Sequence, residues 1–425
     1  MFTLYRRLGE IGLMIYRFFL LIVVGALFFP ATSKAFTFTG QSRTYLQARE
    51  TISGENLTPL YEYLDFKIEN VGSADVSFHF GGWARADLTG ETLGKKTNNE
   101  LQYAYVSYRR PTSNAIVSAG RLYVFEGVAS EQIDGLYTRT DLKGAFGVAV
   151  YGGSPVETDV NTRSGDSIYG ARVSYELRGT YVVGLSYLKE DDNSADFREE
   201  EGIDLWVKPG AKVLLQGRSW YNALTSGWMQ HNYHLLLGPF DKLNLNVEGS
   251  KVSYGDYFQS ATVSAFTFPS IDPNETVSAV GLGARYTISP SLIGIIEYKN
   301  YEYDLAGGAD YYGGGITYAA SSGYGAGISL YRMDGATDNL KYGAYRAYIR
   351  KKRGKTDATL DLLHVAYDQA ISGVTDAYTV VGALGHDMSA KARVVADLEY
   401  GRNPDFDNEV KALLRFVYRF GAKAR

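Results

Sequence analysis

Apolar and polar residues alternate with a period of two along most of the chain. The clearest stretch lies near the C-terminus, where every even position is apolar: Val410, Ala412, Leu414, Phe416, Tyr418 and Phe420. The odd positions of the same stretch include Lys411, Arg415 and Arg419. Successive side chains of a β-strand point to opposite faces, so this pattern predicts a strand with one apolar and one charged face.

About 22 such stretches follow one another, from 36–50 to 409–420, and clusters of Gly, Asn, Asp, Ser and Pro separate them. Most of them exceed the roughly five or six residues of an average globular strand and suit the roughly 9–11 residues that a tilted strand needs to cross a bilayer. Every second connection is short, whereas intervening ones such as 153–165 and 253–275 are longer. Short periplasmic turns and longer external loops are typical of outer-membrane barrels.

A soluble β-sandwich would show the same alternation, with its polar face in water. Tyr residues at strand ends, such as Tyr105, Tyr187 and Tyr318, instead favour the aromatic girdles of a membrane barrel. The sequence therefore predicts an all-β fold, a transmembrane antiparallel up-and-down β-barrel of about 22 strands, within a range of about 18–22. Helical periodicity is hard to find, and the segment 126–140 is the one stretch that could dip inward instead of spanning.

The first 35 residues differ in kind from the rest of the chain. Three arginines, the last of them Arg17, precede the apolar stretch 18–29, and a cleavage motif of small residues ends at Ala35. This arrangement predicts a secretory signal peptide over 1–35 that is cleaved after Ala35. A membrane anchor is the alternative, but it needs about 20 apolar residues. Residues 36–425 then form a single barrel domain.

Composition removes several classes of chemistry. The chain has no cysteine, which excludes zinc–thiolate sites, iron–sulfur clusters, thiol catalysis and covalently attached c-type haem. Its formal net charge of -4 argues against a nucleic-acid-binding protein. His231 and His234 lie three residues apart, which in a strand sends their rings to opposite faces and prevents a joint metal site. No nucleophile elbow, P-loop or dinucleotide fingerprint is present, so we expect no cofactor and no enzymatic activity.

The final strand, EVKALLRFVYRF, is similar to the C-terminal insertion signal of porin-type outer-membrane β-barrels of Gram-negative bacteria. The usual signal ends on its terminal aromatic residue, whereas here Gly421 to Arg425 follow Phe420. The resemblance covers nearly the whole mature chain and implies a location in the outer membrane, contact with its lipid and lipopolysaccharide, and a channel function. Trimeric porins of this class also make a homotrimer one expectation.

A second resemblance concerns GRLYVFEGVASEQIDGLY, residues 120–137, which is similar to the region around the third loop of porin-like channels. In that interpretation Arg121 points into the lumen, and Glu126, Glu131 and Asp134 edge a constriction. An ordinary hairpin with an external loop is the equal alternative.

Charges on otherwise apolar-faced strands are predicted to point into the lumen, because Arg or Lys on the lipid face costs about 2–4 kcal/mol at the midplane. The strongest candidates are Arg85, Asp87, Arg121, Arg172, Arg218, Arg285, Arg346, Arg393 and Arg415. Both signs of charge occur among the inward positions, so the pattern predicts a hydrated wall with cross-strand ion pairs and does not define an ion selectivity.

Two runs of like charge stand at opposite ends of the predicted strands. An acidic external loop holds Glu190, Asp191, Asp192, Asp196, Glu199, Glu200 and Glu201. A basic periplasmic turn holds Arg350, Lys351, Lys352, Arg353 and Lys355. Each run is consistent with a solvated surface. The alternative is an orienting role, in which the acidic loop attracts cations or divalent ions that bridge lipopolysaccharide and the basic turn attracts anionic headgroups or an acidic periplasmic partner.

Two functions follow from these expectations. The first is a water-filled channel for passive diffusion of small hydrophilic solutes or ions. The second is a structural sheath, because the chain is similar in size and plan to the barrel component of porin–cytochrome electron conduits. In that case a periplasmic or extracellular multihaem cytochrome would fill the barrel and carry the haems, since this chain has no cysteine to attach them.

Overall fold

The computed structural model describes residues 36–51, 54–71, 75–110, 112, 114–156, 166–192, 195–261, 272 and 274–423. The predicted signal peptide over 1–35 lies outside these residues. The chain divides into two compact units. The first unit contains Met1–Tyr108, Gly385–Leu398 and Val410–Arg425, and the second contains Arg109–Leu384 and Glu399–Glu409.

The first unit is an antiparallel sheet centred on the first strand. Its strands are β1 (Thr37–Glu50), β2 (Asn56–Leu57), β3 (Pro59–Glu69), β4 (Val76–Asp87), most of β5 (Thr97–Arg110) and of β23 (Phe406–Lys423), and parts of β21 (Val374–Asp387) and β22 (Ala392–Asn403). β1 pairs with β3 on one side and with β23 on the other, so Tyr45 lies between Tyr61 and Arg415. Pairing of the first strand with the last is the closure that distinguishes a β-barrel from an open sheet.

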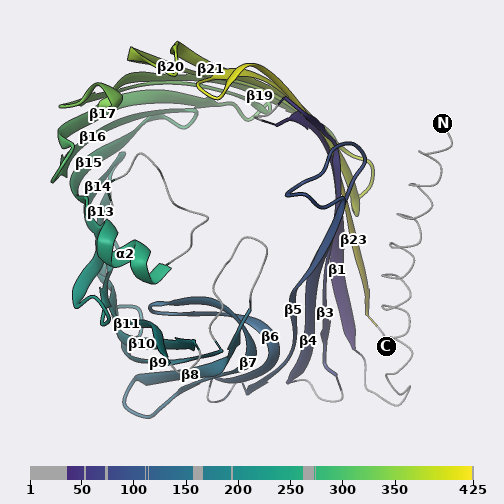
Figure 1. Ribbon diagram of the computed structural model, residues 1–425, viewed down its shortest axis with the longest axis vertical. Coiled ribbons are helices and arrows are strands. Elements are labelled where there is room, and N and C mark those ends of the chain that lie inside the picture. The colour runs from purple at the N-terminus through teal and green to yellow at the C-terminus, as the bar shows by residue number, and fades with distance from the viewer. Residues whose placement is uncertain are drawn as a thin grey trace. The chain divides into compact units, whose positions relative to one another are not determined.

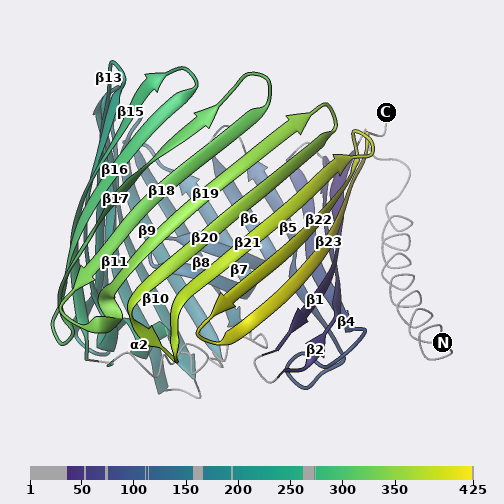
Figure 2. The same ribbon diagram turned by 90° about the horizontal axis from the view of Figure 1, so that it is seen from above.

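The second unit continues the same antiparallel pattern. Its strands are β6 (Ala115–Glu126), β7 (Ala129–Asp141), β8 (Phe146–Pro155), β9 (Ser167–Leu177), β10 (Tyr181–Asp192), β11 (Ala195–Gly210), β12 (Val213–Asn222), β13 (Gly227–Phe240), β14 (Leu243–Ser253), β15 (Thr276–Ser289), β16 (Leu292–Tyr303), β17 (Gly307–Ala319), β18 (Tyr324–Gly335), β19 (Lys341–Arg353), β20 (Thr356–Ile371) and most of β21. From β6 to β20 each strand pairs with the next, and Figure 2 shows β15 to β20 as inclined strands side by side.

The predicted strands are all present, and the all-β barrel class is confirmed. The strand β11 begins inside the run that was interpreted as an acidic loop and extends from Ala195 to Gly210. Three elements were missed: the two-residue strand β2, the helix α2 (Tyr254–Ala261) and the short 3-10 helix η3 (Asp338–Leu340). No helical periodicity indicated α2 in the sequence. An eight-residue helix at the start of a long connection is too short to impose a recognisable period on the sequence.

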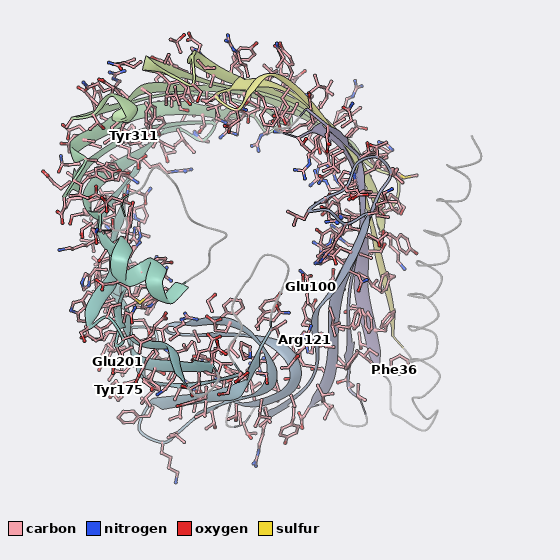
Figure 3. The ribbon with its side chains drawn as sticks, in the orientation of Figure 1. Phe36, Glu100, Arg121, Tyr175, Glu201 and Tyr311 are labelled. Atoms are coloured by element: carbon pink, nitrogen blue, oxygen red, sulfur yellow. The ribbon has the colours of Figure 1, made fainter. Side chains whose placement is uncertain are left out.

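The sheet of the second unit is curved, and its two faces differ in character (Figure 1). Large apolar side chains are exposed on the convex face, among them Leu185 at 59% and Ile296 at 66%. Tyr175 also lies on this side (Figure 3). Alternate positions of the same strands, such as Ser186 and Glu297, point to the concave face. An apolar face this extensive in a folded chain indicates contact with lipid.

The corresponding face of the first unit carries Leu414 and Phe416, both exposed. It is interrupted by Glu62, whose two carboxylate oxygens accept hydrogen bonds from the hydroxyls of Ser42 and Thr44 at 2.6 Å each. These hydroxyls solvate a carboxylate that would otherwise face hydrocarbon without partners.

Within the described residues no helix is both long enough and apolar enough to cross a membrane.

Candidate functional site

The hairpin of β6 and β7 folds onto the concave face of the second unit (Figure 1). Only Gly127 and Val128 connect its strands, and Glu126 pairs with Ala129. Val128 at the tip is 1% exposed, and its backbone N–H donates to Ser186 Oγ on β10 at 3.0 Å. Gly127 has a φ of +62°, and a Cβ built there would lie 2.1 Å from Ser186 Oγ. Glycine is therefore required for the tip to approach the wall this closely.

A buried guanidinium links the hairpin to β11. Arg198 is 4% exposed and donates to Glu131 of β7 at 2.6 Å and to Glu200 of β11 at 2.9 Å. Glu200 is fully buried, and Glu190 on the neighbouring strand β10 is fully buried as well. Buried carboxylates are stable only with charged or hydrogen-bonding partners, so Arg198 is the counter-ion that allows the hairpin to dock.

A second group of charges continues this arrangement along the concave face. Glu126, 4% exposed, accepts from Tyr137 at 2.6 Å and Arg139 at 3.2 Å, and lies 3.6 Å from Arg172. Arg172 also donates to both oxygens of Asp204. We call this set the hairpin network; its members are Glu126, Glu131, Arg139, Arg172, Arg198, Glu200 and Asp204.

The opposite face of the hairpin carries a different pair. Arg121 donates to both carboxylate oxygens of Asp134, at 2.7 and 2.6 Å, and Phe125, four residues further along the same face of β6, is 70% exposed. Figure 3 shows Arg121 on the hairpin. Residues 120–137 thus pair as a hairpin whose tip packs inward on the wall, and the alternative of an external loop at this tip does not hold. Glu126 and Glu131 hold the tip to the wall, whereas Arg121 and Asp134 face away from that wall.

The run interpreted as an acidic external loop lies in strands. Glu190, Asp191 and Asp192 end β10, and Asp196 to Glu201 belong to β11. The loop prediction is corrected because pairing between the two strands continues to Asp192 and Ala195. Strand alternation then sends Glu190 and Glu200 to the buried face, while Glu199 accepts a hydrogen bond from Tyr187 at 2.8 Å on the other face and Glu201 is exposed there. The side chain of Asp196 lies outside the described residues.

The run interpreted as a basic turn is also largely in a strand. Arg350, Lys351, Lys352 and Arg353 end β19, and Lys355 alone lies in the two-residue turn before β20. Lys351 Nζ lies 3.1 Å from the centre of the Tyr324 ring and donates to the Ser322 carbonyl. An aromatic ring next to a cation at a strand end fits the girdle position expected of a membrane barrel.

Arg85 and Asp87 differ from the predicted lumen positions because both are buried, at 4% and 6% exposure. Arg85 donates to the carbonyls of Thr92 and Lys95, and Asp87 accepts from the Thr92 N–H at 2.7 Å. They hold the connection between β4 and β5 against the wall, so their contacts are structural.

The other predicted lumen cations are distributed along the strands. Arg346 pairs with Asp361, Arg393 with Asp387, and Arg415 with Asp397. The Arg218 guanidinium lies 4.3 Å from the centre of the Trp220 ring, and Arg285 is exposed. Cross-strand ion pairs on the polar face are what the sequence predicted for this wall.

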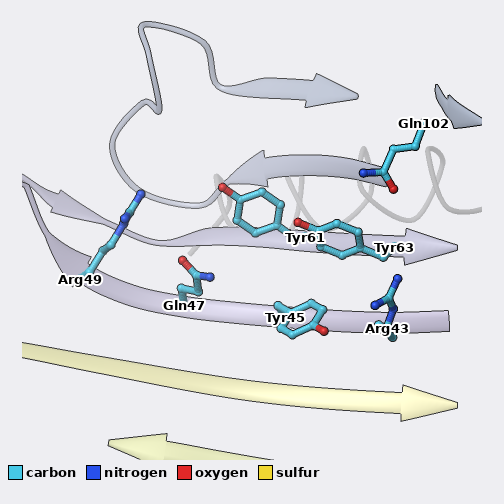
Figure 4. Close-up of a pocket in the computed structure, with 7 residues that line it drawn as sticks. All are labelled: Arg43, Tyr45, Gln47, Arg49, Tyr61, Tyr63 and Gln102. Carbon is cyan, nitrogen blue, oxygen red and sulfur yellow. The ribbon is translucent and has the colours of Figure 1, made fainter. Parts of the chain in front are cut away.

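A pocket of about 550 Å³ lies on the polar face of the first unit and was missed by sequence reasoning (Figure 4). Its lining residues are Arg43, Tyr45, Gln47, Arg49, Tyr61, Tyr63 and Gln102. Four of them occupy every second position of β1, which is a period-two signal that could have identified the site. Among the described residues, no group of three or more His, Asp or Glu side chains is arranged to hold a metal ion.

The chain matches no family of known proteins and no curated protein sequence. Solved structures similar to it include the translocation pore of the P pilus usher PapC, at 9% identity and a TM-score of 0.51, covering 91% of this chain and all of that one. Two others are OccK11 of Pseudomonas aeruginosa, at 10% identity and TM-score 0.45 over 91% and 96% of the two chains, and OccAB4 of Acinetobacter baumannii, at 9% and 0.46 over 92% and 100%.

The likeness to the usher pore concerns the fold alone. Together with the apolar outer face and the pairing of first and last strands, it shows that the chain has the antiparallel β-barrel fold of outer-membrane pores. The exposed apolar face supports a location of this barrel in a membrane.

Proposed function

We propose that this barrel is a water-filled channel through which small hydrophilic solutes or ions diffuse passively across the outer membrane. The observation that carries the proposal is the opposition of the two strand faces. Ile296 is 66% exposed on the apolar face, whereas its neighbours Glu297 and Lys299 form an ion pair at 3.1 Å on the other face. A wall that is apolar outside and charged inside solvates a permeating solute and excludes lipid.

The docked hairpin supports a restricted passage. It places Arg121, Asp134 and the exposed ring of Phe125 on the side away from the wall that it covers. Charged side chains that project from the wall of a channel into water limit the size and the charge of the solutes that can pass. No chemical step is part of this proposal, in keeping with the expectation of no catalysis.

Liposome swelling tests the proposal. Vesicles reconstituted with the protein are expected to swell in isotonic solutions of small sugars and progressively less with larger ones, while vesicles with heat-denatured protein do not swell. Folded, inserted protein that gives no swelling with any sugar would refute passive diffusion.

A further inference from the structure

Aromatic rings form one side of the pocket in the first unit (Figure 4). The rings of Tyr45 and Tyr63 meet edge-on at 5.4 Å, and those of Tyr61 and Tyr63 lie almost parallel at 6.0 Å. Trp83 supports both from β4, at 6.1 Å from Tyr61 and 6.5 Å from Tyr63. Such rings combine an apolar body with a polar hydroxyl, so they suit a ligand that has both C–H faces and hydroxyl groups.

Two glutamines add uncharged hydrogen-bonding groups to the lining. Gln47 and Gln102 each supply a carbonyl oxygen and an NH₂ group, and each tyrosine adds a hydroxyl that both donates and accepts. A small aromatic acid is a less suitable ligand, because its single carboxylate accepts hydrogen bonds and donates none. The mixed donors and acceptors instead suit a hydroxyl-rich ligand such as a saccharide.

Four lining residues follow one another along β1, and the first and last of them carry guanidinium groups. Arg43 lies 3.4 Å from Asp65 and 5.4 Å from the Tyr63 ring, whereas Arg49 is exposed and forms no ion pair with a described residue. No acidic residue lines the pocket among the described residues. Arg49 lies six positions after Arg43 on an extended strand, a distance of about 20 Å, which exceeds the length of a monosaccharide.

We propose that the face formed by Arg43, Tyr45, Gln47, Arg49, Tyr61 and Tyr63 binds an acidic oligosaccharide of uronate units. The tyrosines contact the C–H faces of the sugar rings, the glutamines bond to hydroxyls, and Arg49 with Arg43 binds carboxylates on successive units. The pocket lies within the range of about 300–1,000 Å³ usual for small-molecule sites. The proposal rests on the proposed channel function, for which it names a substrate class.

Equilibrium binding to the detergent-solubilised full chain tests the site without requiring transport. The probes are trigalacturonate, the neutral sugar maltotriose and benzoate, titrated by calorimetry at low and high salt. Trigalacturonate is expected to bind more tightly than maltotriose and to weaken as salt rises, because exposed charges are screened. Arg49→Ala is expected to reduce its affinity roughly tenfold, the effect of losing one charged hydrogen bond. Tyr63→Ala is expected to weaken both sugars.

Lys67→Ala is the matched control. Lys67 lies on β3 on the same face as Tyr63, outside the pocket, and pairs with Glu69. Its replacement should leave trigalacturonate affinity unchanged. Equal binding of trigalacturonate and maltotriose, tighter binding of benzoate, or equal losses in Arg49→Ala and Lys67→Ala would each overturn the proposal. Conductance is measured on the same samples: conductance without trigalacturonate binding overturns only the site, and binding without conductance overturns only the channel.

Discussion

At the scale of single residues, Arg198 joins the hairpin to the wall of the second unit. It is buried between Glu131 of the hairpin and Glu200 of the wall, and 67 residues separate it from Glu131 in sequence. The sequence presents this arginine as a lone cation in an acidic run. Its role could not be predicted, because nothing local indicates which strand it meets.

Replacing Arg198 with Met is expected to destabilise the folded barrel by about 3–5 kcal/mol, since removal of one partner leaves buried carboxylates uncompensated. The free energy of unfolding is measured by urea titration in lipid vesicles. Arg121→Met is the control: its pair with Asp134 is partly exposed, with 26% and 48% of the side chains accessible. Exposed pairs contribute less than about 1 kcal/mol. Equal losses in the two variants would contradict the assigned role of Arg198.

At the scale of elements, the strands were predictable and their inward contacts were not. Alternation and turn residues are local signals, so the stretch 409–420 already indicated β23. The docking of Val128 on Ser186 joins positions 58 residues apart and leaves no periodic trace. Long-range pairing also explains why the prediction for the acidic run was wrong. Its composition suggested a loop, whereas pairing extends β10 and β11 through it.

The absence of native cysteine makes hairpin docking testable by thiol labelling. Val128→Cys is expected to react slowly with a water-soluble maleimide, because Val128 is 1% exposed, and Phe125→Cys quickly, because Phe125 is 70% exposed. Adding Gly127→Ala to Val128→Cys should accelerate labelling, since the new Cβ would collide with Ser186. Rapid labelling of Val128→Cys alone would show that the tip does not rest on the wall.

The two faces of one strand offer a second test at this scale. Ile296→Arg places a charge on the exposed apolar face of β16 and is expected to cost about 2–4 kcal/mol if that face meets the bilayer midplane. Ile295→Arg, one residue earlier on the face of Glu297, should cost much less. The free energy of unfolding of both variants is measured in vesicles. Equally small losses in the two variants would mean that both faces of the strand lie in water.

At the scale of the whole molecule, the partner predictions remain predictions. A multihaem cytochrome of fixed stoichiometry in purified samples would favour the sheath, because this chain has no cysteine to bind such haems itself. A homotrimer and binding of lipopolysaccharide are likewise open to direct measurement. The barrel class could be predicted from the sequence because every strand carries the same two-faced pattern. A protein that filled the barrel would leave no such pattern in this chain.

Single-channel recording in planar lipid bilayers tests the central claim most directly. Purified, heat-modifiable protein is expected to insert and produce stable, discrete conductance steps, because the charged strand face lines water. Gly127→Ala, which displaces the hairpin tip, should change the step size without abolishing the steps. Protein that inserts in folded form and carries no current at any voltage would contradict the account.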